Sequence, residues 1–148
     1  MPQFVLNHVG HCVSDLDVSR RFYTEVLGFE HWRDFDAPDD MTPQLLQLDK
    51  PVGLYAVYLR LGDFVLELLN YREAGQHAPG TVRRMNETGL THLSVSVEDI
   101  EATCTLAVAH GGEVLEDTNV GAAVMIKDPD GQLIELLPIT YAEAMRAL

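Results

Sequence analysis

The sequence has few basic side chains, few cysteines and no long apolar run. Ten Lys and Arg stand against 23 Asp and Glu, which gives 148 residues a formal net charge of −13. Nucleic acids and anionic membrane surfaces are bound by clustered cations, so this balance predicts neither as a partner. Two cysteines are too few for a disulfide scaffold. No apolar run approaches the roughly 20 residues of a membrane-spanning helix, and the start lacks the pattern of a signal peptide. We therefore expect a single-domain protein of the reducing cytoplasm.

Several common catalytic motifs are missing as well. The chain has no Gly-rich phosphate loop, no Cys-x-x-Cys pair and no Gly-x-Ser-x-Gly elbow. Any chemistry must therefore come from residues that lie apart in the sequence and meet in the fold.

The chain contains two copies of one unit. The segments that begin at His8 (HVGHCVSDLD) and at His92 (HLSVSVEDIE) share one pattern, His-x-x-x-x-Val-x-Asp-aliphatic-acidic, 84 residues apart. A second pair, VLELL at 65–69 and LIELL at 133–137, is 68 residues apart. The difference, 84 − 68 = 16 residues, predicts an insertion in the first copy, which we place at 35–51. We predict modules at 1–72 and 88–140, a linker at 73–87 and a C-terminal helix at 140–147.

Each copy predicts a strand, a helix and three further strands. Alternation and turn residues place the strands at 4–13, 29–35, 53–61 and 63–70 in the first copy, and at 90–97, 113–116, 121–127 and 132–137 in the second. A helix follows each leading strand. We expect Asp15 or Asp17 to cap the first helix and Gly28 to end it, and Asp99 to cap the second. The predicted fold class is α+β, with two tandem β-α-β-β-β modules.

Two histidines and two glutamates occupy matching positions in the copies. His8 and His92 lie in the leading strands, and His92 shares its strand face with small polar residues. Glu67 and Glu135 each lie within a strand that is apolar on both sides, where an unpaired charge would be costly. A lone His or Glu of this kind usually has a structural role, but the repetition of both favours a shared purpose. His8, Glu67, His92 and Glu135 are a suitable ligand set for a divalent Zn, Ni, Co, Mn or Fe ion.

Two motifs resemble the vicinal oxygen chelate superfamily, which includes glyoxalase I, methylmalonyl-CoA epimerase, extradiol dioxygenases, and fosfomycin- and bleomycin-resistance proteins. Residues 8–29, HVGHCVSDLDVSRRFYTEVLGF, resemble its opening segment, and 128–136, DPDGQLIEL, resemble its closing strand. The resemblance spans nearly the whole chain. It implies paired modules whose curved mixed sheets form a cup around a metal ion, and substrates that present two adjacent oxygens to that ion.

Within this superfamily, the ligand positions resemble those of glyoxalase I. His8, Glu67, His92 and Glu135 match all four ligands of that type, whereas the dioxygenase and fosfomycin types lack a Glu at the position of Glu67. The resemblance implies Glu135 as the catalytic base and Glu67 as its counterpart. A metal that chelates a carbonyl and a neighbouring hydroxyl acidifies the C–H between them. We expect a metal-dependent lyase or isomerase that transfers a proton on a small oxygenated substrate.

Two alternatives stay open at this point. One is a non-catalytic small-molecule binding or resistance protein of the same fold, and the other is an Fe(II) extradiol-type dioxygenase. Cys12 stands where lactoylglutathione lyase carries an Arg for the glutathione carboxylate, so the use of glutathione is left undecided. We expect a homodimer, the commonest assembly, in which each site is built within one chain or across two.

Overall fold

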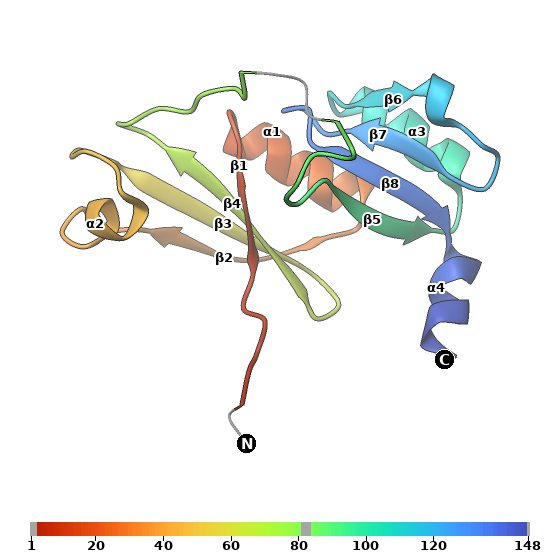
Figure 1. The fold of residues 1–148 in the computed structure, drawn as a ribbon, viewed down its shortest axis with the longest axis horizontal. Helices are drawn as coiled ribbons and strands as arrows, with labels where there is room; N and C mark the ends of the chain where they lie inside the picture. Colours follow the sequence, from red (N-terminus) through yellow and green to blue (C-terminus); the bar gives the residue numbers. More distant parts are fainter. Residues whose placement is uncertain (1–2, 81–83, 148) are drawn as a thin grey trace. The chain divides into compact units, whose positions relative to one another are not determined.

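The structure, a computed structural model, describes residues 3–80 and 84–147. The chain divides into two compact units, one made of residues 1–24 and 28–77 and the other of residues 25–27 and 78–148. Within the described ranges, no helix combines the length and the apolar character needed to cross a membrane. Each unit holds a four-stranded mixed sheet with its own helices (Figure 1), so the predicted α+β class is confirmed.

The first unit follows the predicted β-α-β-β-β order. Its sheet has the strand order β1-β4-β3-β2, with β1 parallel to β4 and the other pairs antiparallel. The elements are β1 (Val9–Cys12), α1 (Leu16–Arg21) with a π-helical turn η1 (Phe22–Val26), β2 (Glu30–Asp36), α2 (Thr42–Leu46), β3 (Leu54–Leu61) and β4 (Phe64–Tyr71). Strand β1 and helix α1, the first two elements of the unit, lie in the segment that begins at His8 and opens the first copy of the repeat.

Helix α1 covers one face of this sheet, and its boundaries follow from the sequence. Asp15 caps it, because the carboxylate accepts hydrogen bonds at 3.0 Å from the backbone N–H groups of Asp17 and Val18. Gly28 ends the helical segment at φ +73°, a conformation that glycine adopts readily. Both choices agree with the sequence prediction. Phe22 and Tyr23 are fully buried, so the turn η1 that continues α1 contributes the two largest fully buried side chains among the described residues.

The predicted insertion packs over part of the opposite face. Residues that precede and follow α2 contribute Ala37 and Val52, which form a buried cluster with Leu54 at the start of β3; Leu46, Leu69 and Tyr71 pack against it. The Asp39 carboxylate accepts hydrogen bonds from the backbone N–H groups of Val52 (2.9 Å) and Gly53 (3.2 Å) and so ties the two ends of the insertion together. The cluster covers the Leu54–Tyr71 end of this face.

The second unit repeats the order. Its sheet has the strand order β5-β8-β7-β6, again with one parallel pair, β5 with β8. The elements are β5 (His92–Val97), α3 (Ile100–Ala109), β6 (Glu113–Leu115), a 3₁₀ turn η2 (Glu116–Thr118), β7 (Val124–Lys127), β8 (Leu133–Pro138) and α4 (Ile139–Arg146). Asp99 caps α3 by accepting a hydrogen bond from the Ala102 N–H at 2.9 Å, as predicted.

One predicted strand is too long. The sequence suggested a strand over 4–13, but β1 covers only Val9–Cys12 and residues 3–8 form no regular element. β4 pairs with β1 only along Leu66–Leu69, and Phe4, Val5 and Leu6 lie exposed. Their apolar character resembled a strand, but no strand within residues 3–80 and 84–147 pairs with them. His8 therefore lies immediately before β1 rather than within it.

Candidate functional site

The first unit brings His8 and Glu67 together. His8 Nε2 lies 3.0 Å from Glu67 Oε2. Glu67 is in the middle of β4 and only 8% exposed, and Gly10 is its register partner on β1. A Cβ at Gly10 would lie 3.2 Å from Leu69 Cδ1 and 3.8 Å from Glu67 Oε2, so glycine keeps open the space beside the carboxylate. The His-x-Gly spacing places the imidazole and the gap on the same side of the sheet.

Tyr58 holds the other oxygen of Glu67. Tyr58 is the register partner of Glu67 on β3, and its hydroxyl donates a hydrogen bond of 2.5 Å to Glu67 Oε1. Burial, followed by this hydrogen bond to a carboxylate, raises the pKa of Tyr58 to about 12. The His8 ring packs edge-on against the Tyr58 ring at a centroid distance of 5.7 Å. Tyr58 thus fixes the rotamer of Glu67 and leaves Oε2 directed to His8.

The second unit carries the matching pair with a different hydrogen-bond donor. His92 Nε2 lies 3.8 Å from Glu135 Oε2, and Ser94 Oγ donates to the same oxygen at 2.7 Å. Ser94 is the register partner of Glu135 on β5, as Gly10 is of Glu67 on β1. The Thr91 hydroxyl lies 2.8 Å from His92 Nδ1 and fixes the orientation of the ring. The small polar face predicted around His92 therefore serves to hold Glu135.

The two pairs are equivalent in position but unequal in support. In the first unit, the residue opposite Glu67 on the antiparallel strand β3 is Tyr58, which donates a hydrogen bond to it. In the second unit, the residue opposite Glu135 on the antiparallel strand β7 is Met125, which has no hydrogen-bond donor in its side chain. The side chain of Glu67 is 11% exposed and that of Glu135 is 32% exposed. The carboxylate of the first unit is therefore clamped by a buried tyrosine. That of the second is held by a single small hydroxyl and is open to solvent.

The donor atoms of each pair suit adjacent ligands of one divalent ion. Imidazole nitrogen and carboxylate oxygen bind such ions at about 2.1 Å, which puts neighbouring donors about 3.0 Å apart at a right angle and about 3.4 Å apart in a tetrahedron. The N···O distances of 3.0 Å and 3.8 Å approach this spacing without rearrangement of the backbone. Among the described residues, no group of three or more His, Cys, Asp or Glu side chains is gathered for a metal. The residues of each pair fit a metal as two ligands.

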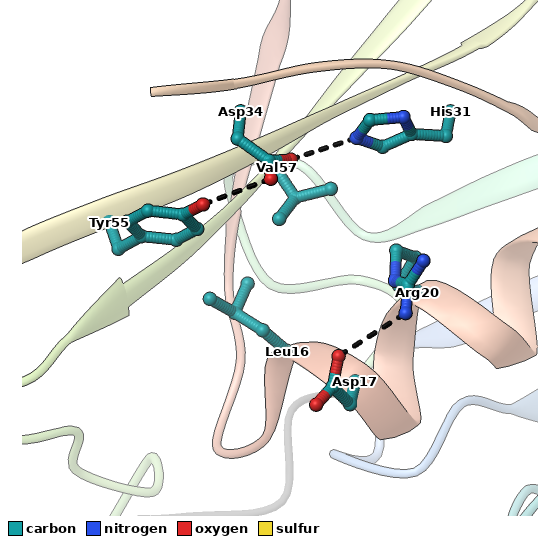
Figure 2. Close-up of a pocket in the computed structure, with 7 residues that line it drawn as sticks. All are labelled: Leu16, Asp17, Arg20, His31, Asp34, Tyr55 and Val57. Carbon is teal, nitrogen blue, oxygen red and sulfur yellow. Dashed lines mark hydrogen bonds and ion pairs between the residues drawn. The ribbon is translucent and has the colours of Figure 1, made fainter. Parts of the chain in front are cut away.

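A polar pocket of about 270 Å³ lies on the other face of the first sheet, beside α1. It is lined by Leu16, Asp17, Arg20, His31, Asp34, Tyr55 and Val57. Figure 2 shows Asp34 between His31 and Tyr55, at 2.8 Å from the His31 Nε2 and 2.9 Å from the Tyr55 hydroxyl. The hydrogen bond with His31 holds the pKa of Asp34 below its usual value, against the opposing effect of burial. These polar groups form hydrogen bonds and an ion pair with one another. We therefore interpret the pocket as a structural hydrogen-bond network at the edge of the sheet.

The sequence singled out His8, Glu67, His92 and Glu135 as one set without indicating how they pair, and it did not point to Tyr58. The predicted strands 53–61 and 63–70 are joined by the turn residues Gly62-Asp63. Pairing them as a β-hairpin around this turn would have placed Tyr58 opposite Glu67. His11, His31 and His110 stand apart from the pairs: His31 contacts Asp34 and His110 lies 3.3 Å from Glu25.

Comparison with known proteins gives a consistent result. The family model described as Glyoxalase/Bleomycin resistance protein/Dioxygenase superfamily matches residues 5–136. A lactoylglutathione lyase of Pseudomonas putida is 32% identical over 152 aligned positions, covering 93% of this chain and 87% of that protein. A "Probable lactoylglutathione lyase" of Vibrio parahaemolyticus is 28% identical, with 89% and 88% covered. The solved trypanothione-dependent glyoxalase I of Leishmania major is 28% identical at a TM-score of 0.66, covering 95% of this chain and 91% of that one.

Proposed function

Since the chain belongs to the glyoxalase/bleomycin resistance protein/dioxygenase superfamily, we propose that it is a metal-dependent lyase or isomerase of the glyoxalase type. Relatives named lactoylglutathione lyase, 28% and 32% identical over about nine-tenths of the chain, support an enzyme of this class. The reaction that we propose is the transfer of a proton between neighbouring carbons of a small oxygenated substrate, next to a carbonyl.

The observation that carries the proposal is the duplicated His–Glu pair. His8 with Glu67, and His92 with Glu135, place a ring nitrogen and a carboxylate oxygen 3.0 Å and 3.8 Å apart at equivalent positions of the two units. These four residues would hold one divalent ion, of Zn, Ni, Co, Mn or Fe. When bound, such an ion polarises a chelated carbonyl and makes the neighbouring C–H more acidic.

The unequal support of the two carboxylates divides their roles. Glu67 is buried and hydrogen-bonded to Tyr58, so it keeps its place during the reaction. Glu135 has one small donor, Ser94, and a side chain 32% exposed, so it has room to turn toward substrate. We assign Glu135 as the general base: it accepts the proton from the C–H beside the carbonyl and returns it to the carbonyl carbon, while the proton of the neighbouring hydroxyl passes to the former carbonyl oxygen. No atom is gained or lost, as an isomerisation requires.

The test compares Glu135→Gln with Glu143→Gln, a substitution at an exposed glutamate of α4. Protein is purified without chelator, its divalent metal is measured, and proton exchange is followed on hemithioacetals, 2-methyl-acyl thioesters and hydroxy-ketones. Loss of a general base lowers turnover about 10²–10⁴-fold, so we expect this loss in Glu135→Gln with metal content retained, and unchanged turnover in Glu143→Gln.

Other outcomes would contradict the proposal. Full turnover of a metal-loaded Glu135→Gln variant would rule out Glu135 as the base. Absence of a stoichiometric divalent metal after reconstitution would favour a non-catalytic binding protein, and oxygen uptake with catechols in the presence of Fe(II) would identify a dioxygenase.

We also propose that the protein works in the cytoplasm as a homodimer. Sedimentation at twice the 16.5 kDa of one chain would test that assembly.

A further inference from the structure

A β-bulge on the edge strand of the first sheet turns two large side chains toward Glu67. Along β2 and β3, His31 is the partner of Leu59 and Arg33 is the partner of Tyr58, so Trp32 is the extra residue. In such a bulge the two residues opposite one partner share a face, which re-aims a side chain that alternation would have sent to the other face. The Trp32 ring packs edge-on against Tyr58 at 6.2 Å. Trp32 and Arg33 thus lie on the side of the sheet that carries Glu67.

Two guanidinium groups gather on this tryptophan. Arg33 Cζ lies 5.2 Å from the centre of the Trp32 ring and 4.8 Å from that of Tyr58, and Arg60 Cζ lies 5.3 Å from the Trp32 ring. Stacking of this kind holds a guanidinium in a defined orientation while its N–H groups stay available. Trp32 itself is 47% exposed. We call Trp32, Arg33 and Arg60 the tryptophan–arginine cluster.

The cluster has no internal anion. Among the described residues, neither Arg33 nor Arg60 forms an ion pair with a carboxylate, although the chain carries 23 acidic side chains against 10 basic ones. Elsewhere, Arg20, Arg72 and Lys127 each lie within 3.5 Å of a carboxylate oxygen. Glu30 is the register partner of Arg60 and Glu67 shares Tyr58 with Arg33, yet among the described residues neither carboxylate forms an ion pair with these guanidinium groups, so both keep donors for an added anion. A ligand carboxylate or phosphate matches the planar fork of a guanidinium.

The cluster adjoins the first His–Glu pair through one side chain. Tyr58 contacts Arg33 with its ring and Glu67 with its hydroxyl. We propose that Arg33 and Arg60 form a subsite for an oxyanion of the substrate, a carboxylate or a phosphate carried beyond the oxygens that react. The identification of the ligand as the substrate rests on the proposed function, and the subsite narrows the substrate class to anionic oxygenated compounds.

The single tryptophan of the chain makes the test direct. Uniformly ¹⁵N-labelled, metal-free full-length protein is titrated with succinate, with phosphate and with neutral succinamide at constant ionic strength, and the one indole N–H signal of Trp32 is followed by NMR. We expect a saturable shift with an oxyanion and none with succinamide. A stronger response to succinate than to phosphate assigns the subsite to a carboxylate, and the reverse assigns it to a phosphoryl group.

Matched variants separate the subsite from general charge effects. Arg33→Gln and Arg60→Gln remove charge-assisted hydrogen bonds, so each is expected to weaken the binding about ten-fold or more. Arg72→Gln changes the net charge equally at a residue paired with Asp36, and should change binding less than two-fold. Arg33→Lys keeps the charge without the fork, and the dispersion of the amide spectrum verifies that each variant folds. Equal shifts with succinamide, or equal weakening by Arg72→Gln, would overturn the proposal.

Failure of the subsite and failure of the proposed function give different results. The titration needs neither metal nor turnover, so a saturable indole shift without proton exchange would leave the subsite standing and refute the lyase or isomerase. Proton exchange that is equally fast on anionic and neutral substrates, and unaffected by Arg33→Gln, would refute the subsite alone. In the active enzyme, we expect Arg33→Gln to lower kcat/KM about ten-fold for the anionic substrate and not for its neutral amide.

Discussion

Replacement of Tyr58 by Phe tests how the protein keeps a charged Glu67 inside an apolar strand. The substitution removes one hydroxyl and keeps the ring, so the edge-on contacts of Tyr58 with His8 and Trp32, at 5.7 Å and 6.2 Å, are retained. It also leaves Glu67 Oε1 without the donor that now lies 2.5 Å away. The expected effect is therefore that of one buried hydrogen bond to a carboxylate.

The magnitude follows from the burial of both groups. Tyr58 is 7% and Glu67 8% exposed, so water cannot readily replace the lost donor. A hydrogen bond to a charged group contributes about 1.5–3 kcal/mol to the free energy of unfolding. At ~2–4 °C per kcal/mol for a chain of this size, the midpoint of thermal unfolding should fall by about 3–12 °C. In the metal-loaded protein, loss of a group that orients a ligand should weaken metal binding about 10–100-fold.

Two further tyrosines supply controls. Tyr71 lies on the same face, and among the described residues its hydroxyl makes no hydrogen bond, so Tyr71→Phe should change stability by less than about 0.5 kcal/mol. Tyr55 donates to the exposed Asp34 at 2.9 Å, and Tyr55→Phe should cost at most about 1 kcal/mol. Urea unfolding followed by circular dichroism measures all three variants. If Tyr58→Phe costs no more than Tyr71→Phe, the reasoning that Tyr58 stabilises a buried carboxylate is refuted.

Two more predictions concern the backbone and the sheet edge. Gly53 has φ +62°, and a Cβ there would lie 2.7 Å from Glu73 Cγ and 3.1 Å from its backbone N, whereas Gly62, at φ +59°, has nothing within 4 Å. Gly53→Ala should therefore lower the free energy of unfolding by more than the roughly 1 kcal/mol of conformational strain expected for Gly62→Ala, and equal losses in urea unfolding would show that crowding by Glu73 has no effect. The hydrogen bond with His31 lowers the pKa of Asp34, so the ionised carboxylate stabilises the folded state above its ordinary pKa of about 3.9, and this contribution is lost as the pH falls below that value. The stability difference between the protein and Asp34→Asn should shrink between pH 5 and pH 3, and a difference that grows on acidification would show the sign to be wrong.

The repeat in the sequence was sufficient to predict the fold class and the four candidate residues, which the structure brings together as two His–Glu pairs. Alternation along β5 set His92 and Ser94 on one face, and strand β8 placed Glu135 within an apolar run, because strand side chains have a period of two. The insertion was predicted from the difference in spacing, and α2 lies within the predicted range. The roles of the four candidate residues in binding a metal stay a prediction.

Other features depend on which strands pair and in what register. The sequence identified Glu67 as an unusual buried carboxylate, but only the pairing of β3 with β4 shows that Tyr58 is its donor. Likewise, the alternation of side chains along a regular strand would place Trp32 and Arg33 on opposite faces of the sheet. Only the bulge of β2 against β3 brings both side chains to one face. The pattern of a strand depends on its own residues, so the sequence alone determined most of the elements and the duplicated His and Glu positions, but neither the start of β1 nor helix α2. Hydrogen-bond partners and bulges depend on the register between strands, which the pattern of one strand does not contain, so the tertiary structure decided how each carboxylate is held and that Trp32 and Arg33 share a face.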